Sequence, residues 1–310
     1  MVFPDPPPRL GKVTGKTISW YEKSGRFSNR FCLYCGAVVG GEADGPSNKE
    51  HLIGRSFVPL GSMGSDAFNF LFRACVPCNT RKALAERHLS STTLLNGPGR
   101  QLDPLAAAAA ARKAVSDFHP NKPGVAMGDA HEAFSVASKL GSMSLDLGFN
   151  APVQANDNLV RELALRHIQG LFSLLTTRDF REASTLRLLL PMQVQLLGAY
   201  PRSDWGNPQL LEVARRAEDW PCHAQIVSAS GYFKATMRRH DTRGWFWALE
   251  WNKYLRVVGA IAKADMALLD ALPDPLWHPL SEGQGRYRLE TPLAEEDDTL
   301  FSGAVVDSFL

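Results

Sequence analysis

Alternating apolar and polar residues mark the C-terminal part of the chain as a region of β-strands. Apolar side chains recur at every second position over residues 233–238 and again over residues 245–251. A period of two places these side chains on one face of a strand, as expected when one face of a sheet is buried. Asn252-Lys253 separates the second segment from the apolar residues 254–258, which predicts a tight hairpin turn. The pattern therefore predicts an antiparallel meander.

Helical spacing of apolar residues dominates the centre of the chain. Residues 157–176 carry leucines at helical spacing and predict a well-buried helix. A proline followed by an alanine run predicts a second helix over residues 104–118, and residues 209–218 predict a third. Residues 185–197 are apolar enough to form a strand. Residues 121–157 are rich in Gly, Ser and Asn, and we expect mostly loop there, with short elements.

Four of the five cysteines occur as two Cys-x-x-Cys pairs, Cys32 with Cys35 and Cys75 with Cys78. Each two-residue spacer lets both sulfurs face one ion, and four thiolates are a ligand set of tetrahedral structural zinc. Such pairs fit metal binding in a reducing compartment better than disulfides, so we expect a cytoplasmic protein. Residues 1–10 lack an apolar signal-peptide core, and no stretch approaches ~18 consecutive apolar residues, which predicts no membrane partner.

The groups needed for hydrolytic chemistry lie between and just after the cysteine pairs. The local pattern predicts two strands and a helix, at residues 50–53, 69–74 and 79–89. In such a unit, Glu50 on the first strand and Asn79 at the helix start can converge on one hard cation. His51 can then accept a proton from a water molecule that attacks a phosphate.

These residues resemble the HNH family of endonucleases. The ββα-metal motif of that family has Asp-His or Glu-His on its first strand, Asn before its second strand, and Asn or His at the start of its helix. The matching positions are Cys32, Cys35, Glu50-His51-Leu52-Ile53, Asn69-Phe70-Leu71, Ala74-Cys75, Cys78-Asn79 and Lys82. The resemblance covers residues 30–90. The chain departs from the pattern in having Glu where Asp is commoner and in its long loop at residues 54–68.

The resemblance implies a metal-dependent nuclease acting on DNA, most naturally double-stranded DNA. By this resemblance, Glu50 and Asn79 hold a catalytic Mg²⁺ or Mn²⁺, and His51 is the general base. Asn69 holds the loop and orients His51, and the four cysteines bind a structural Zn²⁺. Bacterial defence or restriction is a common role of the family.

Positive charge is concentrated in the cysteine-bearing part of the chain. Residues 1–100 contain 13 Lys and Arg against 7 Asp and Glu, whereas the remaining residues contain 21 against 25. A basic surface favours a phosphate-backbone partner, because each neutralised phosphate releases counterions. We expect backbone phosphates to be contacted by Arg55, Arg73, Arg81, Lys82 and Arg87.

A zinc-dependent nucleic-acid-binding or regulatory protein that does not cut is the alternative interpretation. It accounts for the cysteines and for the basic charge. In such modules the two Cys-x-x-Cys pairs are usually separated by ~15–20 residues. Here 39 residues lie between Cys35 and Cys75. The alternative also gives no reason for Glu50, His51 and Asn79 to stand where they do.

The sequence as a whole predicts an α+β protein in two parts. The first is a zinc-bound ββα-metal domain over residues 1–100, with its motif core at residues 30–90. The second is an α+β domain over residues 101–310, in which helices flank the antiparallel meander. We expect the second part to supply specificity or regulation, through a homo-oligomer contact or a regulatory partner.

Overall fold

The computed structural model describes residues 29–40, 45–64, 67–97, 103–119, 121–140, 143–177, 179–240, 244–261, 268, 270–274, 277–279 and 286–303. Within these residues the fold is mixed α/β, with four α-helices and an antiparallel five-stranded sheet. The predicted combination of helices and an antiparallel sheet is therefore confirmed. The proline-rich residues 1–10 lie outside the described residues.

The five-stranded sheet confirms the predicted meander. Its strands are β5 (Val194–Pro201), β6 (Cys222–Ser228), β7 (Phe233–His240), β8 (Gly244–Trp251) and β9 (Leu255–Ile261), in the antiparallel spatial order β5-β9-β8-β7-β6. Asn252 and Lys253 form the turn between β8 and β9 with φ of 54° and 55°. Two consecutive left-handed residues are what a two-residue hairpin turn of this hand requires.

Each face of the sheet packs against a different set of residues. The odd-numbered positions of β8, including Trp247 and Trp251, belong to a large core cluster that also contains residues of the helices on that side. The even-numbered Phe246 and Ala248 belong to a second cluster with Leu210 of a helix on the other side. The period-two pattern of the sequence therefore corresponds to a strand that is buried on both faces.

Most of the observed helix ends agree with those predicted from the sequence. They are α1 (Val76–Asn96), α3 (Pro104–Ser116), α4 (Asp157–Thr176) and α5 (Pro208–Arg216). The side chain of Asn156 caps α4 by accepting hydrogen bonds from the first backbone N–H groups of the helix. The strand predicted at residues 185–197 starts only at Val194, because Pro191 begins a short 3₁₀ turn just before it.

The predicted strand–strand–helix unit is present near the start of the described chain. Strands β1 (Ser47–His51) and β2 (Leu71–Cys75) pair antiparallel, with His51 opposite Leu71. Helix α1 follows β2 without an intervening residue and is longer than predicted. Cys75 is its N-cap residue, and Pro77 lies in its first turn, where a missing N–H does no harm.

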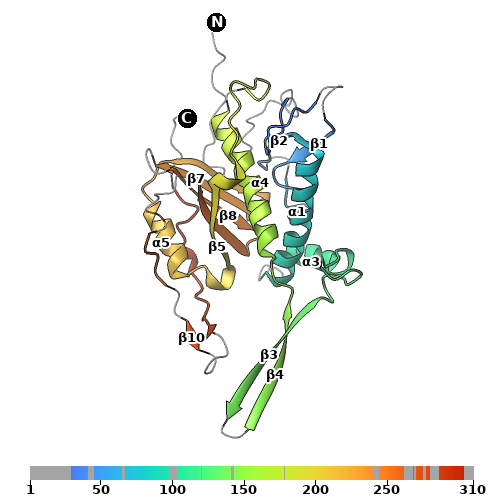
Figure 1. Cartoon of the computed structure of the whole chain (residues 1–310), viewed down its shortest axis with the longest axis vertical. Helices are drawn as coiled ribbons and strands as arrows, with labels where there is room; N and C mark the ends of the chain where they lie inside the picture. The colour runs from blue at the N-terminus through green and yellow to red at the C-terminus, as the bar shows by residue number, and fades with distance from the viewer. Residues whose placement is uncertain are drawn as a thin grey trace.

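The prediction that residues 121–157 are mostly loop is wrong. They contain a long antiparallel β-ribbon made of β3 (His131–Leu140) and β4 (Met143–Pro152). Its Gly, Ser and Asn residues concealed a period-two pattern in β4, where Met143, Leu147 and Phe149 share one face. The ribbon extends away from the rest of the molecule (Figure 1). A second, very short pair consists of β10 (His278–Pro279) and β11 (Arg286–Tyr287).

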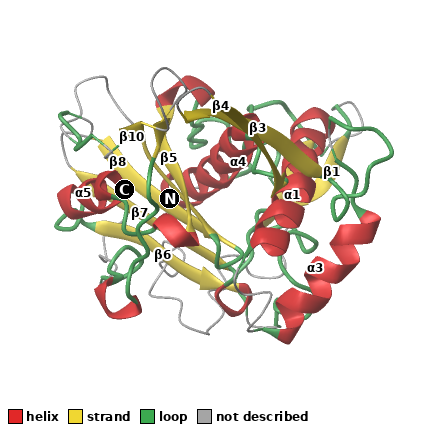
Figure 2. Cartoon of the chain, turned by 90° about the horizontal axis from the view of Figure 1, so that it is seen from below, coloured by secondary structure: helices red, strands yellow, loops and turns green. Residues whose placement is uncertain are grey.

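One hydrophobic core runs across residue 100, where the sequence predicted a domain boundary. Leu52 and Phe72 of the N-terminal unit, Leu171 of α4 and Trp251 of β8 belong to the same cluster of buried residues. Helix α4 lies between the sheet and α1 (Figures 1 and 2). Gly170 permits this packing, because a Cβ atom there would collide with the side chain of Leu52. Packing is therefore continuous between the two parts.

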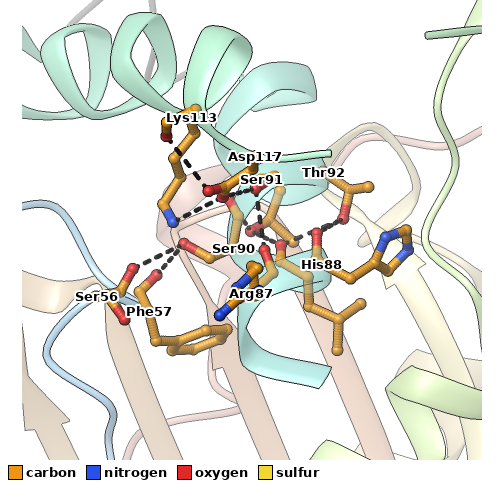
Figure 3. A network of polar contacts seen from close by, with 12 residues as sticks. Ser56, Phe57, Arg87, His88, Ser90, Ser91, Thr92, Lys113 and Asp117 are labelled. Atoms are coloured by element: carbon orange, nitrogen blue, oxygen red, sulfur yellow. Dashed lines mark hydrogen bonds and ion pairs between the residues drawn. The ribbon is translucent and has the colours of Figure 1, made fainter. Parts of the chain in front are cut away.

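Residues 88–94 of α1 are buried on every side of the helix despite their largely polar sequence. Four consecutive hydroxyl residues, from Ser90 to Thr93, are at most 1% exposed. Ser90 donates to the carbonyl oxygen of Phe57 at 2.6 Å, and the Ser91 hydroxyl donates to the carboxylate of Asp117 (Figure 3). Because buried hydroxyls are tolerated only when they are hydrogen-bonded, these contacts account for a polar run inside the protein.

None of the helices in the described ranges combines the length and the apolar character that a bilayer span needs.

His167 of α4 is a fully buried histidine within this core. Its ring lies edge-on to Phe57, Phe233 and Trp251, with ring centroids 5.1 to 5.9 Å apart. Burial, followed by the positive charge of Lys82, holds the pKa of His167 well below its ordinary value of 6.5. The folded protein therefore keeps this imidazole neutral under acidic conditions in which the unfolded chain protonates it.

We expect His167 to make the protein less stable as the pH falls below about 6.5. Below that pH the unfolded state binds a proton that the folded state does not, so the free energy of unfolding falls by up to about 1.4 kcal/mol per pH unit. Denaturant titrations of wild type and His167→Leu between pH 7.5 and 5.5 measure this difference, since other groups titrate in both proteins. Identical pH dependence of the two proteins would contradict the prediction.

Candidate functional site

The four predicted metal ligands come together at one end of the ββα unit. Cys32 and Cys35 lie on a turn before β1, Cys75 ends β2, and Cys78 lies in the first turn of α1. Their sulfur atoms all lie within 4.8 Å of one another, and the Sγ atoms of Cys35 and Cys75 are 3.6 Å apart. A tetrahedral ion with metal–sulfur bonds of about 2.3 Å separates its sulfurs by about 3.8 Å. The cluster can therefore hold a metal ion.

Two backbone hydrogen bonds hold the first cysteine turn, which carries Cys32 and Cys35. The N–H of Gly36 donates to the carbonyl oxygen of Cys32 at 2.8 Å, and the N–H of Cys32 donates to that of Ala37 at 2.7 Å. Gly36 has a φ of +79°, a conformation in which a residue with a Cβ atom is strained. A Cβ atom there would also collide with Leu188, so the turn is packed against the C-terminal part of the chain.

The cysteine thiols are close enough to change each other's acidity. A hydrogen bond with the Cys78 thiol lowers the pKa of Cys32 to about 5, whereas burial raises the pKa of Cys35 to about 11. Crowded sulfurs of this kind resist carrying several negative charges. A bound cation removes that repulsion and allows all four to ionise.

Two amide side chains hold the cysteine turn in place. The amide of Asn29, which is 3% exposed, donates to the carbonyl oxygen of Arg73 at 2.8 Å and accepts from its N–H at 2.7 Å. Gln169 of α4 donates to the carbonyl oxygens of Tyr34 at 3.0 Å and Leu189 at 2.7 Å. The first contact attaches the turn to β2, and the second attaches it to the C-terminal part of the chain.

A buried charge cluster connects α1 to the end of β1. The ammonium group of Lys82, which is 1% exposed, lies 2.7 Å from Glu50 Oε1 and 2.6 Å from Glu86 Oε1. It also donates to the carbonyl oxygen of His51 at 2.9 Å. Glu86 Oε1 accepts from the N–H of Gly54 at 2.9 Å, and the Cβ atom of any other residue at 54 would collide with this carboxylate.

This cluster corrects the role predicted for Lys82. All three of its donors are used inside the protein, so Lys82 does not present its charge to a phosphate. Glu50 is 4% exposed, and the Tyr34 hydroxyl also donates to its Oε1, at 3.4 Å. Burial raises the pKa of Glu50, although Lys82 opposes the shift. The carboxylate predicted to bind a cation is thus already paired with an ammonium group.

The residues on either side of the long loop are joined by Asn69. Its side-chain oxygen accepts from the N–H of Ile53 at 3.0 Å, and its side-chain nitrogen donates to the carbonyl oxygen of Ile53 at 2.7 Å. This double contact fixes the backbone two residues after His51. His51 itself is half-buried, and burial, with Arg55 and Lys82, lowers the pKa of its imidazole below 6.5.

The other predicted residues are distributed unevenly around this site. Asn79 is half-buried in the first turn of α1, three residues before Lys82 and hence on the same helix face. Arg55 and Arg81 are exposed, and Arg73 is half-buried in β2. Arg87 is exposed but lies about two turns along α1 from Asn79, and its charge acts on Lys113 of α3. Arg87 is thus the outlying member of the set.

Sequence reasoning missed four residues that shape the site: Asn29, Tyr34, Glu86 and Gln169. Glu86 had a signal, since it stands four residues after Lys82, the spacing of helical ion pairs. The other three are single polar residues whose partners are distant in sequence. The chain matches no protein-family model, no curated protein and no solved structure.

We expect Lys82→Met to lower the free energy of unfolding by about 3–5 kcal/mol, because it leaves the carboxylates of Glu50 and Glu86 buried without a cation. Arg81→Met changes the neighbouring exposed residue and should stay within about 0.5 kcal/mol of wild type. Denaturant unfolding of the three proteins tests the difference. A stable Lys82→Met protein that binds DNA less tightly would instead restore the phosphate-contact role.

We expect one tightly bound metal ion per chain at the cysteine cluster. Cys75→Ser should lose the ion and lower the free energy of unfolding by roughly 4 kcal/mol or more. Cys222→Ser is the control, because Cys222 is buried in β6 away from the cluster. Elemental analysis of the purified proteins measures the ion. Equal metal content in the two variants would exclude the cluster as its site.

Proposed function

We propose that this protein is an HNH-type endonuclease that hydrolyses phosphodiester bonds of double-stranded DNA, with a structural Zn²⁺ and a catalytic Mg²⁺ or Mn²⁺. The observation that carries the proposal is the ββα unit itself. His51 ends β1, and Asn79 lies in the first turn of α1, the helix that is attached to this end of β1 by the 2.9 Å hydrogen bond from Lys82 to the His51 carbonyl oxygen. Base and metal ligand thus come from adjoining elements.

His51 serves as the general base. A base must be neutral before it accepts a proton from water, and burial and the nearby cationic groups keep the pKa of His51 below 6.5. The double hydrogen bond between Asn69 and Ile53 holds the backbone that follows His51. Asn69 therefore acts as a positioning residue.

Asn79 and Glu50 are the ligands of the divalent ion, which relieves negative charge on the phosphate and the leaving oxygen. The contacts of Glu50 with the described residues are made through Oε1, so Oε2 is left as the acceptor for the ion. Because a carboxylate has two oxygens, it can bind Lys82 with one and an ion with the other. Lys82 then orients Glu50.

Exposed arginines of the same unit supply contacts to the DNA backbone. Arg55 follows β1 closely and its charge acts on His51, and Arg81 is exposed near the start of α1. Guanidinium groups bind phosphates without reading base sequence. Zn²⁺ held by the four cysteines would join the Cys32–Cys35 turn to the junction of β2 and α1, where Asn79 lies.

A zinc-dependent nucleic-acid-binding protein that does not cut is the second candidate. The ion pair between Glu50 and Lys82 favours it, because an ammonium group lies 2.7 Å from one of the two carboxylate oxygens of Glu50. The cysteine cluster and exposed arginines serve this function equally well. The two candidates differ in catalysis and in the need for a divalent ion.

We expect purified protein to nick supercoiled plasmid in Mg²⁺ or Mn²⁺, and His51→Ala to be at least ~100-fold slower, because general-base catalysis contributes about that much. Asn79→Ala should require a higher concentration of the divalent ion. His131→Ala is the control, since His131 is exposed at the start of the β-ribbon. Gel analysis of nicking against time measures all four proteins.

Two results would overturn the nuclease proposal. The first is plasmid binding without nicking at any concentration of either ion, which leaves the binding protein as the function. The second is unchanged nicking by His51→Ala, which would place the activity outside this site or in a contaminant.

A further inference from the structure

A cavity of about 220 Å³ lies between the first half of α4 and the start of β5. These two elements lie side by side (Figure 1), and Trp247 of β8 forms part of the cavity wall. The residues that line the cavity come from α4, from residues 191–196 and from β8, and none of them belongs to the ββα unit. The cavity is therefore separate from the candidate site described above.

The inner wall of the cavity is apolar. It includes Leu165 of α4, Leu196 of β5 and the fully buried Trp247. Gly259 of β9 pairs with Leu196 on one side and with Trp247 on the other. A Cβ atom at Gly259 would collide with both the Trp247 ring and the carbonyl oxygen of Gln195. The glycine therefore allows the indole to extend across β9 to β5, where it reaches the cavity.

The rim of the cavity carries one charge of each sign. Arg161 and Glu162 are consecutive residues of α4, and Asn158 lies one turn before them on the same side of the helix. Arg161 is exposed, and its guanidinium makes no hydrogen bond or ion pair with the residues that the structure describes. This cation is therefore available to an anionic group at the mouth of the cavity.

Arg166 holds the carboxylate of Glu162 in one position. It donates to Glu162 Oε1 from Nε at 2.8 Å and from Nη2 at 2.6 Å. Arg166 is held in turn, because it donates to Gln169 Oε1 at 3.1 Å and its guanidinium lies over the Tyr34 ring. Both bonds to Glu162 use Oε1, so Oε2 has no partner within the described ranges. A carboxylate fixed in this way is preorganised to bind a cation.

We propose that this cavity binds a free α-amino acid with an apolar side chain, such as leucine. The ligand carboxylate pairs with Arg161, its ammonium group pairs with Glu162, and its side chain packs against the inner wall. Each part of the ligand thus meets a group of complementary character. The volume is below the roughly 300–1,000 Å³ of pockets for drug-sized molecules, which favours a ligand as small as an amino acid.

The two charges of the rim favour a zwitterion over other small ligands. A phosphate or a simple carboxylate pairs with Arg161 but lies close to the Glu162 carboxylate, which repels it. A simple amine pairs with Glu162 but is repelled by Arg161. A neutral apolar molecule pairs with neither charge and gains only the contacts of the inner wall. An amino acid satisfies both charges and the apolar wall together.

Calorimetric titration of the full-length protein with leucine and phenylalanine tests the proposal. Isocaproate and hydrocinnamate are the same molecules without the ammonium group, and isoamylamine and phenethylamine are the same molecules without the carboxylate. We expect at least one of the two amino acids to bind with a Kd below ~1 mM and at least ~10-fold more tightly than its two analogues, as for the loss of one charge-assisted contact. The proposal is overturned if neither amino acid binds up to ~10 mM, or if an analogue binds as tightly.

Three variants test whether binding takes place in this cavity. Arg161→Met removes the exposed guanidinium, and Leu165→Trp fills the cavity while both rim charges stay. Arg187→Met is the matched control, because Arg187 is an exposed arginine beside the other end of α4 and does not line the cavity. We expect the first two variants to weaken amino-acid binding at least ~10-fold and the control to leave it unchanged. Unchanged affinity in Arg161→Met or in Leu165→Trp overturns the proposal.

Discussion

The burial of a single ammonium group governs the geometry of the N-terminal unit. An uncompensated charge inside a protein is strongly destabilising, so Lys82 can be buried only where three acceptors converge on it. Glu50 on β1, the carbonyl oxygen of His51 and Glu86 one turn further along α1 provide them, at 2.6 to 2.9 Å. This requirement fixes both the rotation of α1 and its distance from β1. The positions of His51 and Asn79 follow from it.

Local pattern was sufficient for much of the fold. The helix at residues 157–176 and the turn at Asn252-Lys253 were predictable, because spacing and turn chemistry act over a few neighbouring residues. The β-ribbon at residues 131–152 was not, since it is set by cross-strand pairing and lacks the buried core that makes alternation conspicuous. The continuity of packing across residue 100 depends on contacts between distant segments, such as Leu52 with Gly170, which no local pattern reveals.

Some features of the candidate site were likewise predictable from local sequence, and others were not. The convergence of the four cysteines followed from their spacing, because each pair is a local turn with known ligand geometry. The burial of Lys82 was not predictable, since a lysine on a helix is usually exposed and its partner Glu50 lies on another element. Asn29 and Gln169 gave no signal, because an amide that stabilises a turn has the same sequence appearance as any surface amide.

The hydrogen bonds from Gln169 to the cysteine turn limit how this chain could be truncated or fused to other proteins. A fragment ending near residue 100 would lose α4, and with it both the support of the turn and the surface that covers Leu52 and Phe72. The ββα unit therefore depends on α4 and is not an independent module. Fusion or grafting into another scaffold must include α4, and a displacement of α4 in the intact chain removes the hydrogen bonds that support the cysteine turn.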